Sequence, residues 1–285
     1  MFTALTLALA LAPAQNDAVT LKWSLKPGDV FYSKNVTVMD MKIGVAGQMI
    51  DQKQEITAVM RYKVKAAEGS NLVLELTYVE MKMTGTPGTD AVTEKMKGAT
   101  VTATLNGKME VTKIDGHKKL LEDLSGGDPM VKMMLAAMIS EDAVKQMFSQ
   151  LFAVTPEKPV KVGDAWTKND TVDAGGIGKV TAKSKHTLKK VDGDSATIDT
   201  TADMTFKAGD GEGLPFKITK ADFKIEKYTG SSVFDMKAGR LKEAKSEMTM
   251  TGTMTVGVGG QEIDATLTQK VKTAAVVSDK NPVKD

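Results

Sequence analysis

The feature that most constrains the fold is a period-two alternation of apolar and polar residues along most of the chain. Between Met248 and Val258, methionine and valine alternate with threonine and glycine. Similar alternations occur at residues 39–45, 72–78 and 101–105. Because successive side chains of a strand point to opposite faces, this pattern predicts strands with one apolar face and one polar face.

Short turn signals separate the alternating runs. They are Glu68-Gly69-Ser70, Asn106-Gly107, Asp115-Gly116, Asp192-Gly193-Asp194 and Lys237-Ala238-Gly239. Glycine next to Asn or Asp is typical of tight hairpin turns. A long series of hairpins with one apolar face predicts a mainly β protein, built as a large curved antiparallel sheet or an open barrel.

One region, residues 117–153, has helical spacing instead. Asp128 followed by Pro129 predicts the capped start of one helix, and Ser140 predicts the cap of a second. The first of these helices is apolar nearly all round, which is typical of a helix that is buried or packs on a partner. We expect this helical insert to pack on the concave face of the sheet.

A duplicated phrase indicates two related halves. KPGDVF at residues 26–31 returns as KVGDAW at residues 161–166, and the hairpin glycines Gly69 and Gly116 align with Gly193 and Gly239. The sequence predicts half-repeats at 21–115 and 156–277, joined by the helical insert and followed by a polar tail at 278–285. Neither half has its own flexible linker, so residues 15–285 are expected to form a single domain with one core.

The duplicated phrase itself predicts a structural role. Gly28 and Gly163 permit the positive φ of a tight turn, and Asp29 and Asp164 can bond to backbone amides two residues further on. Phe31 and Trp166 are then expected to enter the core as a strand begins. We interpret these six residues as structural anchors and not as catalysts.

The first residues predict export. An uncharged apolar run from Phe2 to Ala12 is followed by Ala12-Pro13-Ala14, the small-x-small pattern of a signal-peptide cleavage site. Residues 1–14 are therefore expected to be a signal peptide, and the mature chain to be periplasmic or secreted without a transmembrane segment. The chain has no cysteine, which excludes disulfides, cysteine-based metal sites and a lipidated anchor at the cleavage site.

Composition and motifs argue against several functions. The net charge is +2, arginine occurs only at Arg61 and Arg240, and aromatic residues make up 5% of the chain, so nucleic acid is not expected as a partner. The histidines, His117 and His186, lie in lysine-rich stretches and are expected at the surface. No G-x-S-x-G, P-loop or dinucleotide-binding motif occurs, so we expect neither an enzyme nor a cofactor. Acidic residues are abundant, so a catalytic pair of carboxylates, as in glycosidases, stays an alternative.

Metal binding is a minor alternative. The acidic pairs Asp192/Asp194 and Asp210/Glu212 supply too few oxygen ligands for a calcium loop. Among the 19 methionines, the pairs Met39/Met41, Met81/Met83 and Met248/Met250 each place two thioethers on one strand face, which could suit copper(I). We favour core packing for these pairs and expect no metal site.

The methionines also suggest a pliable apolar cavity. A curved sheet lined with flexible side chains and covered by an apolar helix pair could enclose an apolar ligand. The candidate lining residues are Met130, Met133, Met134, Met138, Phe148 and Phe152.

The signature KPVKVGDAW at residues 158–166, with the segment Leu25 to Phe31, resembles an uncharacterised, planctomycete-type family of secreted bacterial proteins. This domain of unknown function implies no activity and no site residues. The layout is also distantly similar to the bacterial lipoprotein carriers, in which a curled sheet wraps helices around a hydrophobic cavity. The sequence thus favours a non-enzymatic cell-envelope binding or carrier protein for an apolar or lipid-like ligand. The alternative is a structural or interaction protein with a filled core, and the sequence identifies no protein partner.

Overall fold

The computed structural model describes residues 17–65, 69, 71–85, 90–138, 140–173, 178–209, 211, 217–258 and 261–283. The expected signal peptide, residues 1–14, lies outside the described residues. The strands are β1 (Val30–Val45), β2 (Gln48–Lys65), β3 (Leu72–Thr84), β4 (Thr100–Leu105), β5 (Val111–Asp115), β6 (Ala165–Asp173), β7 (Gly178–Asp192), β8 (Ser195–Ala208), β9 (Lys217–Asp235), β10 (Arg240–Val258) and β11 (Gln261–Ser278). The helices are α1 (Asp90–Met96), α2 (His117–Ser125), α3 (Pro129–Met138) and α4 (Glu141–Phe152).

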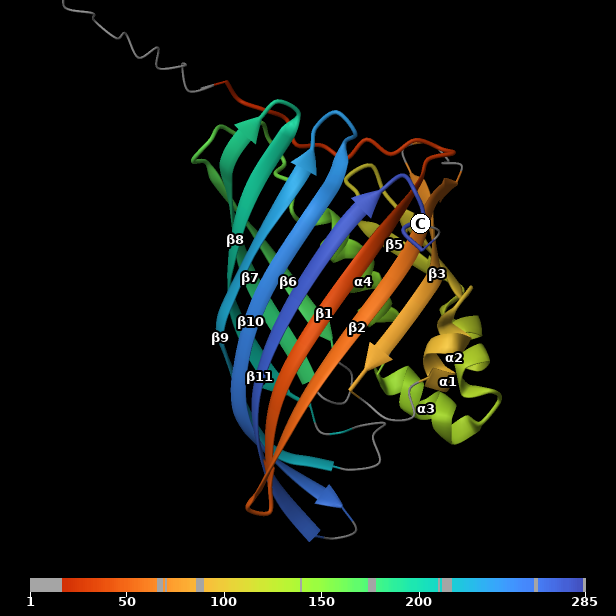
Figure 1. The fold of residues 1–285 in the computed structure, drawn as a ribbon, viewed down its shortest axis with the longest axis vertical. Helices are drawn as coiled ribbons and strands as arrows, with labels where there is room; N and C mark the ends of the chain where they lie inside the picture. The colour runs from red at the N-terminus through yellow and green to blue at the C-terminus, as the bar shows by residue number, and fades with distance from the viewer. Residues whose placement is uncertain are drawn as a thin grey trace, which may run out of the picture.

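Within the described residues, the strands form one antiparallel sheet in the order β5-β4-β3-β2-β1-β11-β10-β9-β8-β7-β6. Every sheet neighbour is a sequence neighbour except β1 and β11, which pair at the centre. The sheet curls but is not closed, and β5 and β6 are its edges (Figure 1). The predicted mainly β fold, a large curved antiparallel sheet with a helical insert, is confirmed.

The helical insert carries the chain from one edge of the sheet to the other. Helix α4 packs against both edge strands, β5 and β6, and its Phe148 is only 1% exposed in the same buried cluster as Phe31. Helix α1 packs on β3, α2 on β4, and α3 on α2 (Figure 1). The predicted cap of α3 is present, since Asp128 Oδ1 accepts hydrogen bonds from the amides of Met130 and Val131 at 2.8 and 3.1 Å.

The two copies of the duplicated phrase form the same turn. Gly28 and Gly163 have φ of 96° and 94°, a region that favours glycine. The Gly28 amide donates to the carbonyl of Val64 on β2 at 2.9 Å, and the Gly163 amide donates to the carbonyl of Leu188 on β7 at 2.8 Å. Each turn therefore fixes the first strand of one half, β1 or β6, against the next strand.

The aspartates of the two turns also act alike. Asp29 Oδ2 accepts from the Lys26 amide at 2.7 Å, and Asp164 Oδ2 accepts from the Lys161 amide at 2.8 Å. The bonded amide thus lies three residues before the aspartate, not two residues after it as predicted. The side chain closes the turn behind it, which supports the structural interpretation of Asp29 and Asp164.

The glycine alignment is only partly correct. Gly69 and Gly193 lie in the corresponding β2–β3 and β7–β8 connections and both have positive φ. Gly116 precedes α2, however, whereas Gly239 lies between β9 and β10. That pair is not equivalent, because the first half passes into the helical insert after β5 while the second continues through β10 and β11.

The buried core gathers at one end of the sheet, which we call the filled end. The segment before β1 crosses this end (Figure 1): Val19 bridges to Val160, and the Ser24 amide donates to the Gly239 carbonyl at 2.9 Å. Trp23 on this segment lies edge-on to Phe152 of α4, with ring centroids 4.8 Å apart, and to Phe234 of β9 at 5.8 Å. The largest fully buried side chains of the filled end are Phe31, Phe148, Phe234, Leu21, Leu74, Leu76, Leu105, Leu188 and Ile198.

Candidate ligand-binding site

The concave face changes character away from the filled end. On β1 the face that carries Phe31 continues through alternate residues to Met39, Met41 and Ile43, which are half-buried. The pairing register places half-buried apolar residues of β11 and β10 beside them. We call this wall the trough; it comprises Met39, Met41, Ile43, Met248, Met250, Met254, Leu267 and Val271.

Neighbouring residues of the trough lie directly opposite one another. Met39 pairs with Val271, which pairs in turn with Met248. Gln269, one rung further along, donates a hydrogen bond from Nε2 to Met39 Sδ at 3.7 Å. The trough is therefore a continuous surface in which a polar side chain is tied to a thioether.

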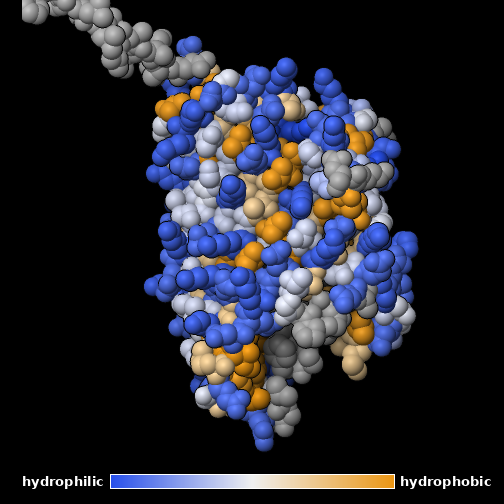
Figure 2. Space-filling view, viewed as in Figure 1, coloured by the Kyte–Doolittle hydropathy of each residue, from blue (hydrophilic) through white to orange (hydrophobic). Residues whose placement is uncertain are grey.

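The other face of the same strands is polar. Asp40 and Lys42 on β1, and Lys270 and Lys272 on β11, are exposed. Figure 2 shows this outer face as mostly hydrophilic, interrupted by a narrow hydrophobic streak. This face thus presents charge to solvent, with Val276 as an exposed apolar exception, while the apolar residues of the trough lie toward the hollow.

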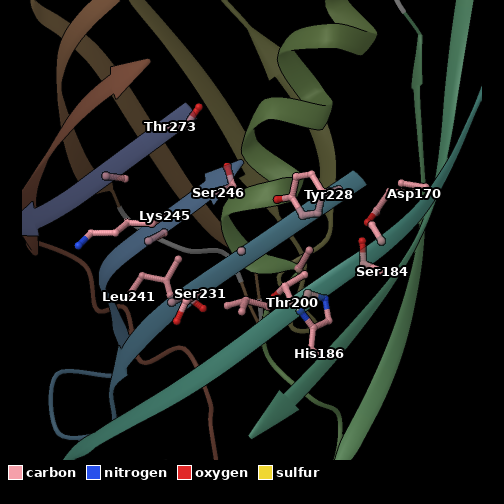
Figure 3. A pocket seen from close by; sticks show the side chains of 18 of the residues that line it. Asp170, Ser184, His186, Thr200, Tyr228, Ser231, Leu241, Lys245, Ser246 and Thr273 are labelled. Atoms are coloured by element: carbon pink, nitrogen blue, oxygen red, sulfur yellow. Dashed lines mark hydrogen bonds between the residues drawn. The ribbon is translucent and has the colours of Figure 1, made fainter. Parts of the chain in front are cut away.

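A pocket of about 370 Å³ lies between the filled end and the trough. Its walls include small side chains of the concave face and the two residues that follow α4 (Figure 3). Small residues on neighbouring strands leave room that larger ones would fill. They include Ala182, Thr200, Ala202, Gly230, Ser246 and Ala275, with Ala153 and Val154 after the helix.

His186 is a buried polar residue of this pocket, with 6% of its surface exposed. Its Nδ1 lies 2.9 Å from Thr200 Oγ1, and its ring stacks on Trp166 with centroids 5.7 Å apart. Burial, reinforced by the positive charge of Lys168, lowers the pKa of His186 to about 4. The imidazole is therefore neutral at neutral pH.

The prediction that both histidines lie at the surface is wrong. His117 is 8% exposed and His186 is 6% exposed. On β7 the lysines that flank His186 in sequence, Lys183 and Lys185, are exposed, because they occupy the alternate positions that face outward. The alternation on this strand was the signal that places His186 on the concave face with Leu188.

Three buried polar atoms at this position have no hydrogen-bond partner within the part of the chain that the structure describes. They are His186 Nε2, Ser232 Oγ and Trp166 Nε1. His186 and Ser232 both line the pocket. Asp170, on edge strand β6, also lines it, and burial raises the pKa of this carboxyl against the opposing effect of Lys168. His186 and Ser232 therefore offer the pocket uncharged hydrogen-bonding groups.

The residues predicted as cavity lining lie elsewhere. Met130 and Met133 on α3 are 76% and 58% exposed. The side chains of Met134 and Met138 lie outside the described set. Phe148 and Phe152 are buried in the filled end, where they pack and do not face open space. Apart from Ala153 and Val154, which follow α4, most of the described lining comes from strands, and the apolar pattern of the helices did not predict it.

The anchor aromatics differ in burial. Phe31 is 1% exposed and stacks on Tyr62 with centroids 4.9 Å apart, whereas Trp166 is half-buried against the same core. Arg240 also lies over the Phe31 ring, with its guanidinium carbon 5.4 Å from the centroid.

The structure also shows where most of the acidic and methionine pairs considered as metal ligands lie. Asp192 pairs with Lys190 at 2.8 Å, and this lysine lowers the pKa of the carboxyl, while Asp210 and Glu212 lie outside the described residues. Within the described ranges, no group of three or more acidic, histidine or cysteine side chains could hold a metal ion. Met39/Met41 and Met248/Met250 lie in the trough, and Met81/Met83 are half-buried on β3. Copper binding by these pairs stays a minor alternative to the predicted core packing.

The fold and site define an open, curved β-sheet protein with an apolar concave wall. The chain belongs to a family of unknown function, DUF6263, whose model matches residues 53–258. The signature at 158–166 falls inside this range and the segment 25–31 falls outside it. No curated protein matches the chain. Among the helices that the structure describes, none is long and apolar enough to span a membrane.

Several solved structures resemble parts of the fold. A lipovitellin structure described by its lipid–protein interactions is 11% identical, with 90% of this chain and 25% of that chain covered and a TM-score of 0.47. The outer membrane protein OprG from Pseudomonas aeruginosa is 8% identical, with 92% and 99% covered and a TM-score of 0.25. A DUF1329 family protein from Desulfovibrio piger is 12% identical, with 85% and 84% covered and a TM-score of 0.18. The chain spans about a quarter of the lipovitellin chain, and at these TM-scores none of the three informs the function.

Proposed function

We propose that this protein is a non-enzymatic binding or carrier protein that holds an apolar or lipid-like ligand against the trough. The observation that carries the proposal is the half-buried state of the trough, next to a filled end whose equivalent positions are fully buried. An apolar sheet face is stable in water when another layer covers it. A bound apolar molecule would supply that layer.

The energetic argument favours an adaptable ligand. Apolar surface removed from water contributes about 25 cal/mol per Å². The trough is rich in methionine, such as Met39, Met41 and Met250, whose flexible thioether chains fit irregular shapes. A long-chain molecule without fixed geometry matches such a wall better than a rigid, polar metabolite.

We also propose that the protein acts in the cell envelope or outside the cell. The support is the apolar run from Phe2 to Ala12 with its small-x-small end. An exported carrier for an apolar molecule would shield its ligand from water between membranes or outside the cell.

Native mass spectrometry of protein purified from its own source tests the proposal. A co-purifying lipid-like mass, together with uptake of an apolar fluorophore by the delipidated chain, is the expected result. Ala202→Phe, which fills the pocket, should weaken fluorophore binding at least about 10-fold through steric exclusion. Thr201→Phe is the matched control, because residue 201 is exposed on the outer face of the same strand.

A second candidate is a structural or interaction protein with no small-molecule ligand. The favouring observation is the dense packing of the filled end, where Phe31, Phe148 and Phe234 are at most 1% exposed. A clean ligand-free mass combined with no fluorophore uptake would select this candidate over the carrier.

A further inference from the structure

One transverse row of the concave wall is polar. The pairing register aligns His186, Thr200, Gly230, Ser246, Thr273 and Thr37 on the six neighbouring strands β7, β8, β9, β10, β11 and β1. We call this set the polar row. Its members are small or carry a hydroxyl, except for the imidazole of His186, and each member pairs directly with the next one on the neighbouring strand.

The polar row separates two apolar regions. One rung toward the filled end, Leu188 and Ile198 are fully buried next to Ser232. One rung in the other direction, Met39, Val271 and Met248 begin the trough. On β1, β11 and β10 the wall is therefore polar at this row and mainly apolar beyond it in the trough, where Gln269 is a polar member.

Two side chains at this boundary have unused hydrogen-bonding capacity. His186 and Ser232 are 6% and 7% exposed and both line the pocket. Neither His186 Nε2 nor Ser232 Oγ has a partner among the described residues. Buried polar atoms in folded proteins are nearly always hydrogen-bonded, so a molecule in the pocket is the natural partner.

The charges around the pocket disfavour an anion. His186 is neutral, because burial depresses its pKa. Lys245 is exposed and in Figure 3 extends away from His186, Thr200 and Tyr228. The Lys168 ammonium lies 3.5 Å from the carboxylate of Glu157, and Asp170 adds a carboxyl to the lining. A carboxylate or phosphate at His186 would be desolvated beside Asp170, because Lys245, although it lines the pocket, extends its ammonium away from this position.

We propose that the polar row and pocket hold the uncharged, hydrogen-bonding head of an amphipathic ligand, such as a hydroxyl or ester carbonyl, whose apolar chain lies along the trough. This inference rests on the proposed function and specifies its ligand class. From Thr37 the concave face of β1 continues to Val45. At about 3.3 Å per residue that distance is roughly 26 Å, longer than one leaflet of a bilayer's hydrocarbon core at about 15 Å.

The test compares three probes with the same chain and different heads: hexadecane, hexadecanol and hexadecanoate. Each displaces a bound apolar fluorophore from the delipidated full chain at neutral pH. Hexadecanol should bind about 10-fold more tightly than hexadecane, the effect of satisfying a buried hydrogen bond. Hexadecanoate should bind no more tightly than hexadecane.

Two variants test whether the preference for hexadecanol over hexadecane arises in the pocket. Ser232→Ala should remove most of the hexadecanol preference and leave hexadecane affinity within about 2-fold, because it deletes only the hydroxyl. Thr201→Ala, on the outer face beside Thr200, is the matched control and should change neither. A second measurement needs no variant: hexadecanol, and not hexadecane, should shift the ¹⁵Nε2 resonance of His186.

The outcomes are distinguishable. Equal affinity for hexadecane and hexadecanol would overturn the inference while the proposed function stands. Tightest binding of hexadecanoate would also overturn it, by showing an anionic head. Failure of all three probes to bind would defeat the proposed function and this inference together.

Discussion

The filled end and the trough are two regions of the same curved sheet that differ in how deeply their apolar side chains are buried. Along β1, Phe31 at the filled end is 1% exposed, whereas Met41 on the same face is half-buried. The filled end is covered by the segment that carries Trp23 and by α4. The trough faces the hollow of the curled sheet. The difference shows that strand alternation decides which face is apolar, while separate segments decide where that face is covered.

The two regions also use different side chains. The filled end relies on aromatic and branched residues such as Phe148, Phe234 and Ile198, which pack in defined rotamers. The trough uses methionine at Met39, Met248 and elsewhere, and methionine adapts its shape. Rigid packing suits a permanent core, and adaptable packing suits the exchangeable ligand proposed for the trough.

The largest expected difference between the filled end and the trough is in the stability lost when a side chain is replaced by alanine. Phe234→Ala should lower the free energy of unfolding by about 3–5 kcal/mol, because Phe234 is 0% exposed and its removal leaves a cavity. Leu267→Ala in the trough should cost about 1 kcal/mol or less, since the half-buried Leu267 gives up less contact. Urea denaturation of the ligand-free variants measures both, and equal losses would contradict the distinction.

The contribution of His186, which lies between the filled end and the trough, to the free energy of unfolding should depend on pH. The pKa of His186 is about 4 in the folded protein, against an ordinary value of 6.5. Between these values the unfolded chain binds more protons, so the free energy of unfolding falls as the pH is lowered from 6.5 to 4. The contribution of His186 is at most about 3 kcal/mol.

The wild type alone does not isolate this effect, because the raised pKa of Asp170 acts in the opposite direction. The comparison is with His186→Gln, which keeps a polar side chain and cannot titrate. The stability of the variant should fall less than that of the wild type over this pH range. Parallel pH profiles would show that His186 is not buried as a neutral group.

A smaller, matched effect is expected at the two turns of the filled end. Gly28→Ala and Gly163→Ala should each lower the free energy of unfolding by about 1–2 kcal/mol, because alanine is strained at φ of 96° and 94°. An added Cβ would meet nothing within 4 Å at either position, so the loss is conformational and should be equal. Losses that differ by more than about 1 kcal/mol would argue against equivalent turns.

Much of the fold follows from the sequence. The threonine–methionine alternation from Met248 predicts strand β10, and the Asp128-Pro129 pair predicts the start of α3. The turn glycines Gly28 and Gly163 are equally local signals, since a tight turn with positive φ needs only its own residues. The Gly116 and Gly239 alignment failed because Gly116 follows the fifth strand of its half and leads into α2, whereas Gly239 follows the fourth strand of its half and leads into β10.

The site was less predictable for a physical reason. Phe31 and Met41 have the same alternation, and only the tertiary covering makes one buried and the other half-buried. The apolar pattern of α3 pointed to Met130 and Met133 as lining, yet this helix packs on α2 and leaves both exposed. His186 could have been assigned to the concave face from sequence, because Lys183 and Lys185 occupy the alternate positions of β7 and lysine favours the solvent-facing side.

The central claim is that an apolar ligand lies in the trough. Methyl NMR of protein labelled at methionine, titrated with hexadecanol, tests it most directly, because methionines lie both in the trough and on α3. The account predicts shifts of Met39, Met248 and Met250 in the trough and none at Met130 or Met133 on α3. Shifts confined to Met130 and Met133 would contradict it and would place the ligand on the helix.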